Sequence, residues 1–201
     1  MDRFIADLVG EGGFFIEAGA NDGFRMSNTY LLERRYGWHG LLVEPIPRLA
    51  DLCASRRNRS ETFQCALVAE EVHGATIQIQ YADGHSVVGG SISHDDWSIA
   101  AGWGIEQTYM LDVPARTLTG LLDEIRAPAN PDLLSLDVEG YEPQALAGLD
   151  LKRYRPRYVL VEASVEDLPS FGDEFNTSYE VVKQFPGRNL LLACRGSEDN
   201  R

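Results

Sequence analysis

A seven-residue segment rich in glycine and carboxylates has the clearest chemical character in this chain. The segment Glu-Ala-Gly-Ala-Asn-Asp-Gly occupies residues 17–23 and directly follows the apolar run Phe-Phe-Ile at 14–16. A strand that ends in a carboxylate and then turns through two glycines brings main-chain N–H groups close to a ligand. The pattern indicates a site for a nucleotide-type cofactor; the plain alternative is a tight turn that binds nothing.

The charge of this segment separates two kinds of cofactor. A dinucleotide-binding loop places a pyrophosphate at the positive end of the next helix, where carboxylates would repel it. Here Glu17 and Asp22 bracket the turn, and two acids suit a ligand that carries an ammonium and a sulfonium group. We therefore expect S-adenosylmethionine. A nicotinamide-dependent oxidoreductase is the disfavoured alternative.

Two further sites are predicted at the ends of the next apolar runs. Glu44 ends the second run and lies 21 positions after Gly23, a spacing at which an acid accepts hydrogen bonds from ribose hydroxyls. The alternative is a solvated loop glutamate. Cys65 and Ala66 are small enough to let an adenine ring lie flat against the sheet, or they are ordinary core packing.

A second acidic segment provides candidates for catalysis. Asp137, Glu139 and Glu142 follow the apolar run at 133–136, and Glu162 ends the next run. Carboxylates at such a position can serve as general bases or as ligands of a Lewis-acidic metal. Asp137 and Glu162 could act as bases or hold a hard divalent ion such as Mg²⁺; the alternative is helix capping and support of the cofactor loop. His94 is a further candidate base, against a surface histidine, and His85 is another.

Alternating apolar runs and amphipathic segments must position these groups. We expect buried strands at residues 14–18, 40–43, 63–68, 133–137 and 158–162, and helices at 27–36, 48–56, 117–125 and 142–149. Residues 178–185 and 190–194 form two strands joined by a tight turn. The pattern predicts an α/β fold, with a mainly parallel sheet flanked by helices and closed by a C-terminal antiparallel hairpin.

The stretch from 69 to 112 is the least regular part of the chain. Residues 75–81 alternate apolar and polar side chains and predict a half-exposed strand. The following segment contains glycines, two histidines, paired aspartates and tryptophan, and we expect a substrate lid at 84–110. A surface insertion without function is the alternative.

Size and charge limit the possible functions. The chain has 201 residues, of which 44% are hydrophobic, and we expect one domain over residues 1–201. A formal charge of −13 argues against binding the phosphate backbone of nucleic acid. Short basic clusters, such as Arg56, Arg57 and Arg59, are expected on solvated faces. The oligomeric state leaves no signal in the sequence.

Cysteine usage and hydropathy bear on localisation. Cys53, Cys65 and Cys194 are far apart and lack a C-x-x-C spacing, so neither disulfides nor a zinc site is expected. No stretch approaches the ~18 apolar residues that a membrane span needs, and residues 1–9 lack the apolar core of a signal peptide. We expect a soluble, untargeted, cytoplasmic protein that does not bind membranes.

Four strings together resemble the FkbM-type S-adenosylmethionine-dependent methyltransferases. They are FFIEAGANDGFRMSNTYLLERRYGWHGLLVEP, CALV, LLSLDVEGYEPQALAGLD and PRYVLVEAS, in the order and spacing of that family and spanning roughly residues 14–164. The resemblance implies a Rossmann-like class I methyltransferase that methylates hydroxyls, commonly of sugars or polyketides. A binding module that kept the fold and lost the reaction is the remaining alternative.

The resemblance also implies roles for individual residues. The residues that match the family's cofactor-binding motifs are Glu17, Gly19, Asn21, Gly23, Ser27, Asn28, Glu44 and Asp137. Ser27 and Asn28 belong to the Ser-Asn-Thr-Tyr segment beside the methionine part of the cofactor. Glu17 stands where the family more often has aspartate. Residues 84–110 match no known motif, so the acceptor is not identified.

Overall fold

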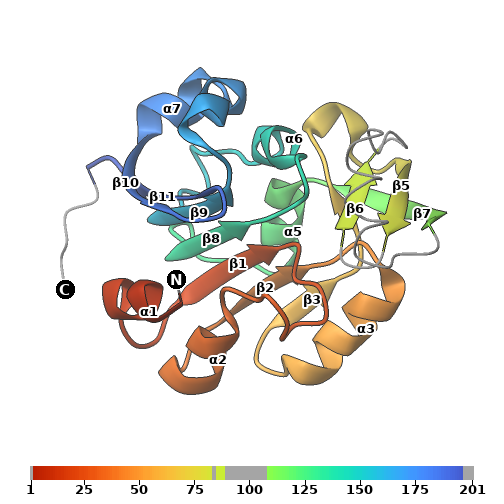
Figure 1. Cartoon of the computed structure of the whole chain (residues 1–201), viewed down its shortest axis with the longest axis horizontal. Helices are drawn as coiled ribbons and strands as arrows, with labels where there is room; N and C mark the ends of the chain where they lie inside the picture. Colours follow the sequence, from red (N-terminus) through yellow and green to blue (C-terminus); the bar gives the residue numbers. More distant parts are fainter. Residues whose placement is uncertain (1, 83–84, 89–107, 197–201) are drawn as a thin grey trace.

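The apolar runs form the centre of one large sheet. The computed structural model describes residues 2–82, 85–88 and 108–196 (Figure 1). Its main sheet has seven strands in the order β10-β11-β9-β8-β1-β2-β3. Those strands are β1 (Phe14–Ala18), β2 (His39–Val43), β3 (Glu61–Phe63), β8 (Leu133–Leu136), β9 (Tyr158–Glu162), β10 (Tyr179–Phe185) and β11 (Asn189–Cys194).

Strand direction follows the expectation from the sequence. β3, β2, β1, β8 and β9 pair in parallel, with Ile16 beside Leu41 on one side and beside Leu134 on the other. β11 pairs antiparallel with both β9 and β10. The α/β fold with a mainly parallel sheet and a C-terminal antiparallel hairpin is confirmed. Its parallel strands end at one edge, where the loops that carry the acidic motifs meet.

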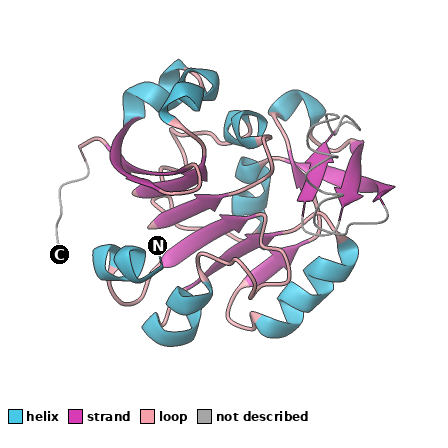
Figure 2. Cartoon of the chain, in the orientation of Figure 1, coloured by secondary structure: helices cyan, strands magenta, loops and turns pink. Residues whose placement is uncertain are grey.

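Helices cover both faces of this sheet (Figures 1 and 2). Phe15 points to the face covered by α1 (Asp2–Val9), α2 (Tyr30–Tyr36) and α3 (Pro47–Arg56), whereas its neighbours Phe14 and Ile16 point to the other face. That second face is covered by α5 (Leu118–Glu124), α6 (Glu142–Ala147) and α7 (Asp173–Ser178) with the 3-10 helix η2 (Val165–Phe171). None of the helices in the described ranges is long and apolar enough to cross a bilayer.

A second, smaller sheet lies beside the carboxyl edge of the main one (Figure 1). Its strand order is β4-β7-β5-β6, and its strands are β4 (Ala66–Leu67), β5 (Thr76–Ala82), β6 (His85–Val88) and β7 (Thr108–Arg116). The strand expected at 75–81 is confirmed as β5. The 3-10 helix η1 (Glu70–Val72) joins β4 to β5.

The single strand expected at 63–68 is wrong, because the chain changes sheets within it. β3 ends at Phe63 in the main sheet, and β4 begins at Ala66 in the small sheet, paired with β7. Between them the Gln64 side chain donates a hydrogen bond of 2.8 Å to the carbonyl of Pro45. An apolar run records burial and not the identity of the partner strand, so hydropathy could not locate this break.

Two other expectations are corrected by the described residues. The stretch from 69 to 112, expected to be the least regular, also contains the start of β7, whose residues 108–114 pair with β5. The expected lid at 84–110 therefore has strands at its two ends, in β6 and β7, and its remainder lies outside the described residues. The helix expected from 27 begins at Tyr30, whose N–H donates 3.0 Å to the Ser27 hydroxyl.

Candidate functional site

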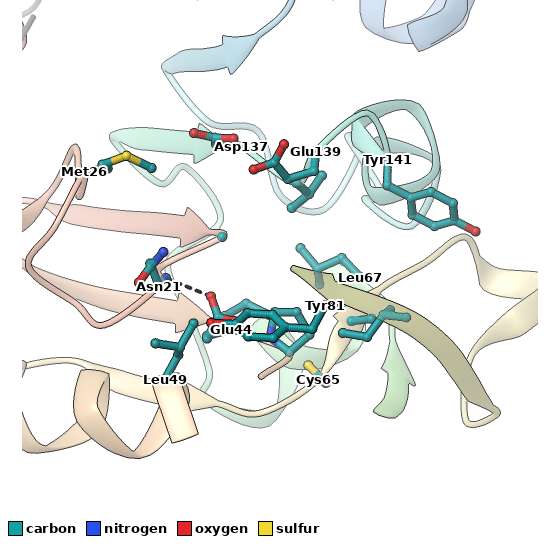
Figure 3. Close-up of a pocket in the computed structure, with 16 residues that line it drawn as sticks. Asn21, Met26, Glu44, Leu49, Cys65, Leu67, Tyr81, Asp137, Glu139 and Tyr141 are labelled. Atoms are coloured by element: carbon teal, nitrogen blue, oxygen red, sulfur yellow. Dashed lines mark hydrogen bonds between the residues drawn. The ribbon is translucent and has the colours of Figure 1, made fainter. Parts of the chain in front are cut away.

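A pocket opens where the parallel strands end. It lies between the loops after β1, β2 and β8 and the small sheet (Figure 3). Pockets at the carboxyl ends of parallel strands commonly bind cofactors or small substrates. Its lining residues are Gly19, Asn21, Met26, Val43, Glu44, Pro45, Leu49, Cys65, Ala66, Leu67, Ile79, Tyr81, Asp137, Val138, Glu139 and Tyr141.

Glu44 is a buried acceptor at the end of β2. Its carboxylate accepts hydrogen bonds from the N–H of Asn21 at 2.8 Å and from the N–H of Ile46 at 3.0 Å. Burial raises the pKa of Glu44 to about 7, although these two bonds lower it. A ligand that brings hydroxyl donors or positive charge would favour the ionised form. The residue therefore has the position and the chemistry expected of a ribose-binding acid.

Gly19 lets the first loop pass close to the end of β8. Its φ is +81°, and a Cβ placed on it would lie 1.8 Å from the carbonyl oxygen of Asp137. Its N–H donates to the carbonyl of Val43 at 3.0 Å, and the N–H of Asp137 donates to the carbonyl of Ala18 at 3.1 Å. The absence of a side chain at Gly19 allows three strand ends to meet around one pocket.

Asp137 and Glu162 come together as the sequence predicted. They follow β8 and end β9, which are neighbours in the sheet. Burial, then the hydrogen bond with Glu162 and its negative charge, raise the pKa of Asp137 to about 8. At neutral pH the protonated form of Asp137 is therefore favoured. Asp137 lines the pocket, whereas Glu162 is not among its lining residues.

The sequence predicts a divalent metal ion at Asp137 and Glu162. Within residues 2–82, 85–88 and 108–196, no group of three or more His, Cys, Asp or Glu side chains is placed to hold a metal ion. Mg²⁺ usually takes one or two carboxylates together with waters and substrate oxygens. A metal at Asp137 and Glu162 stays a prediction. His94, the other expected base, lies outside the described residues.

Cys65 and Ala66 line the pocket, as expected of small residues beside an adenine ring. They lie at the passage from β3 into β4, where the chain crosses between the two sheets. Burial raises the pKa of the Cys65 thiol to about 12, so the side chain is a small apolar surface and not a nucleophile.

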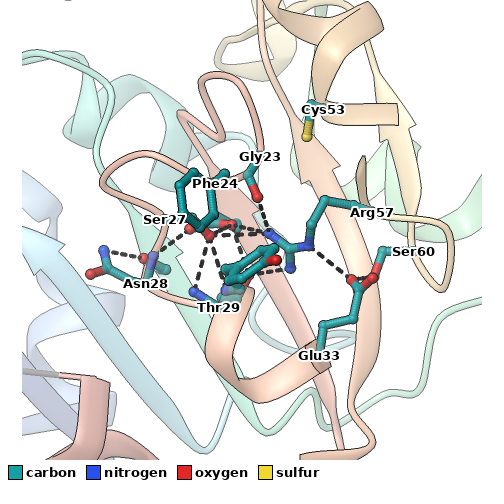
Figure 4. A network of polar contacts seen from close by, with 12 residues as sticks. Gly23, Phe24, Ser27, Asn28, Thr29, Glu33, Cys53, Arg57 and Ser60 are labelled. Atoms are coloured by element: carbon teal, nitrogen blue, oxygen red, sulfur yellow. Dashed lines mark hydrogen bonds and ion pairs between the residues drawn. The ribbon is translucent and has the colours of Figure 1, made fainter. Parts of the chain in front are cut away.

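Four other residues expected at the cofactor lie behind the pocket instead of lining it. The Glu17 carboxylate accepts from Ser27 Oγ at 2.9 Å, from the N–H of Asn28 at 2.7 Å and from Thr29 Oγ1 at 2.7 Å (Figure 4). The Asn28 amide donates to Ser135 Oγ at 3.0 Å. Gly23 packs against Cys53 and Arg57. These contacts therefore hold the loop on the side away from the pocket. They are made by Glu17, Gly23, Ser27 and Asn28.

Arg57 is the residue that sequence reasoning misplaced. It was expected on a solvated face, yet its side chain is 1% exposed and pairs with Glu17 and Glu33. The position directly follows α3, and its neighbour Arg56 does remain partly exposed in an ion pair with Asp22. Adjacent arginines look alike in sequence, and only the orientation of the helix end decides which one turns inward.

The sequence also did not predict that the small sheet forms one wall of the pocket. Ile79 and Tyr81 from β5 and Leu67 from β4 line one side of the pocket, and Tyr141 lines another (Figure 3). Tyr81 is 4% exposed. The alternation in residues 75–81 was the available signal, because it placed Ile79 and Tyr81 on one face of a strand without identifying what that face covers.

The sheet order and the helices on its two faces define the Rossmann-like methyltransferase fold. Residues 17–184 match the FkbM methyltransferase domain. The chain belongs to this family, as its sequence motifs implied. The comparison with curated proteins finds no match.

Two solved structures illustrate the fold. An FkbM methyltransferase from Methylobacillus flagellatus KT aligns over 94% of this chain and 46% of its own, with 15% identity and a TM-score of 0.54. An O-methyltransferase from Bacillus cereus in complex with SAH aligns over 96% of this chain and 78% of its own, with 13% identity and a TM-score of 0.52. The chain thus spans less than half the length of the Methylobacillus protein.

Proposed function

We propose that this chain binds S-adenosylmethionine in the pocket and transfers its methyl group to a hydroxyl of a small molecule, a sugar or a polyketide. The observation that carries the proposal is the buried Glu44 carboxylate, held by two main-chain N–H groups at the end of β2. Bound S-adenosylmethionine supplies an electrophilic methyl group. The residues of this chain have to orient it, exclude water and receive the proton of the acceptor.

The charges of the pocket fit this cofactor. Glu44, Asp137 and Glu139 line it, and no Lys or Arg is among the lining residues of the described chain. The acids suit a cationic cofactor and would repel the pyrophosphate of a dinucleotide. This contrast favours a methyltransferase over a nicotinamide-dependent oxidoreductase.

Asp137 is the proposed general base. Its carboxyl lines the pocket, and in its ionised form, favoured above the pKa of about 8, it can take the proton of the acceptor while keeping its hydrogen bond with Glu162. Positioning of the reacting groups is the larger contribution in such displacements, up to about 7–11 kcal/mol in favourable systems. General base catalysis adds about 10²–10⁴-fold.

The same charges restrict the acceptor. A phosphorylated or carboxylated acceptor would meet the acids Asp137 and Glu139, whose ionised forms repel anions, without a basic partner among the lining residues. Residues 83–84 and 89–107, which the structure does not describe, contain no Lys or Arg in the sequence. We therefore propose an acceptor that is uncharged or cationic, with an apolar part for contact with Tyr81 and Tyr141.

Calorimetry with S-adenosylmethionine tests the proposal. We expect saturable binding that Glu44→Ala weakens by well over tenfold, whereas Glu61→Ala, at an exposed glutamate on neighbouring β3, leaves it unchanged. Absence of binding to the wild-type chain would overturn the proposal. Binding without methyl transfer across a panel of uncharged and amine-bearing hydroxyl compounds would favour a non-catalytic module.

A further inference from the structure

The buried guanidinium of Arg57 binds the loop that carries the pocket residues Asn21 and Met26, on the side away from the pocket. We call residues 19–29 the cofactor loop. Arg57 donates to the Gly23 carbonyl at 3.3 Å, to Ser27 Oγ at 3.1 Å and to Thr29 Oγ1 at 2.8 Å. A single side chain, itself outside the pocket lining, therefore contacts the cofactor loop at three points along its length (Figure 4).

Glu17 also binds the cofactor loop, at residues 27–29. Its two carboxylate oxygens accept from the Ser27 hydroxyl, the Asn28 N–H and the Thr29 hydroxyl, and one of them also accepts from Arg57 at 3.3 Å. Glu17 is 2% exposed. Charge-assisted hydrogen bonds at a buried site are stronger than neutral ones, because water does not compete for them.

The cofactor loop has a backbone shape that needs such support. Asn21 and Met26 adopt left-handed backbone angles, with φ of 49° and 57°. Non-glycine residues rarely adopt this conformation, which costs of order 1–3 kcal/mol when the surroundings impose it. Burial cannot hold Met26 in place, since its side chain is 75% exposed. Polar contacts instead fix the loop on both sides of Met26, since Asp22 accepts from the N–H groups of Phe24 and Arg25, and Glu17 and Arg57 bind residues 27–29.

We propose that Glu17 and Arg57 act as a positioning pair, which holds the cofactor loop in the shape that brings Asn21 and Met26 to the pocket. The consequence for cofactor binding rests on the proposed function; the consequence for the shape of the loop does not. Neither residue is among those that line the pocket. The pair acts through the Gly23 carbonyl, the Ser27 and Thr29 hydroxyls and the Asn28 N–H.

Glu33 offers a matched control on the same guanidinium. It accepts from Arg57 Nε at 3.0 Å and, on its far side, from Ser60 Oγ and the Arg59 N–H. It is 5% exposed, as buried as Glu17. Glu17→Gln and Glu33→Gln each leave Arg57 paired with one carboxylate, so the charge of the guanidinium stays balanced in both variants. Each variant loses the hydrogen bonds of one buried carboxylate. They differ in whether the lost contacts belong to the cofactor loop.

Hydrogen exchange of the protein without cofactor tests the shape of the loop. We expect Glu17→Gln to speed amide exchange across residues 19–29 by about tenfold or more, because the amide NH₂ of glutamine would face hydroxyl and guanidinium donors. Glu33→Gln should lower the melting temperature by a similar amount and leave loop exchange near the wild-type rate. Equal exchange of the loop in the two variants would overturn the proposal.

Calorimetry with S-adenosylmethionine tests the consequence for binding. We expect Glu17→Gln to weaken affinity by about tenfold and Glu33→Gln to leave it within about twofold. If the wild-type chain binds no cofactor, the proposed function fails while hydrogen exchange still decides the role of the pair. If the wild-type chain binds and both variants bind alike, the positioning role fails and the proposed function stands.

Two milder variants keep the test decisive if Glu17→Gln does not fold. Ser27→Ala removes a hydroxyl that bridges Glu17 and Arg57 and leaves every buried charge in place, so faster loop exchange is expected. Arg57→Lys keeps the charge but lacks the planar fork that reaches Glu33, Gly23 and Thr29 together. We therefore expect residues 19–29 of this variant to exchange faster than in the wild-type protein. Wild-type loop exchange in both variants would contradict the proposal.

Discussion

The main-chain N–H of Asn21 donates a 2.8 Å hydrogen bond to the carboxylate of Glu44. This bond joins the loop after β1 to the end of β2, and a second bond from the N–H of Ile46 completes the environment of the carboxylate. Because both donors are neutral, burial dominates and the pKa of Glu44 rises to about 7. The acid proposed to bind ribose is therefore half protonated near neutral pH when no ligand is present.

Cofactor affinity should depend on the ionisation of Glu44. Ribose hydroxyls and a sulfonium favour the carboxylate, so binding releases a proton below the pKa of about 7. We expect affinity to fall by about tenfold for each pH unit below that value and to level off above it. Calorimetry between about pH 5.5 and pH 8.5 measures this profile. Glu44→Gln should flatten it, and an unchanged slope in that variant would refute the assignment.

The same carboxyl should lower the stability of the ligand-free protein at high pH. Its pKa is raised in the folded state, from 4.5 to about 7, so the folded form holds its proton while the unfolded chain loses it. Stability is then fully present below about pH 4.5 and is lost as the pH rises through 7, by an amount on the order of 3 kcal/mol.

Glu44→Gln tests this effect on stability. The difference in melting temperature between the variant and the wild-type chain should move in favour of the variant as the pH is raised from about 5 to about 8.5. Glu61→Gln, at an exposed position on β3, should show no such trend. A difference that does not change with pH would mean that Glu44 is ionised throughout.

The rate of methyl transfer should report the carboxyl pair of Asp137 and Glu162. If Asp137 is the base, kcat/KM rises with pH toward a plateau above its pKa of about 8. Glu162→Gln removes a negative charge and replaces a proton-accepting carboxyl with an amide, so the apparent pKa should fall. Rate profiles of the two proteins with one acceptor decide the matter. Identical profiles would assign the pH dependence to another group.

Glycine 19 should tolerate no side chain. In Gly19→Ala the new Cβ would lie 1.8 Å from the Asp137 carbonyl oxygen, at a φ of +81°, so a strand end must move. We expect a loss of several kcal/mol, or failure to fold. Gly140→Ala is the matched control, because its φ is +88° with nothing within 4 Å of the new Cβ.

Comparison of the two glycine variants separates backbone strain from collision. Strain alone costs roughly 1–2 kcal/mol for a residue in the left-handed region, and Gly140→Ala should lose about that much. Thermal unfolding of both variants measures the difference. A similar melting temperature for Gly19→Ala and Gly140→Ala would show that β1 and β8 separate easily at their ends.

Much of the fold could be predicted because it depends on local patterns. Buried parallel strands read as short apolar runs, and their alternation with amphipathic segments predicted the sheet and most helices. The limits of helix α2 and of the strand at 63–68 could not be predicted in this way. Ser27 and Thr29 are bound by Glu17, and the chain leaves β3 so that β4 can pair with β7. Both events depend on tertiary contacts, which a local hydropathy pattern does not record.

The sequence by itself determined that acids and glycines follow the strands of a parallel sheet, so their meeting at one edge follows from the fold. Only the tertiary structure decided which acid faces the pocket. Glu17 shares the α2 face of β1 with Phe15 and turns to Arg57, 40 residues away, whereas Glu44 closes the pocket. Strand alternation assigns a side chain to a face, but the path of the loops and the position of one buried guanidinium decide what that face contacts.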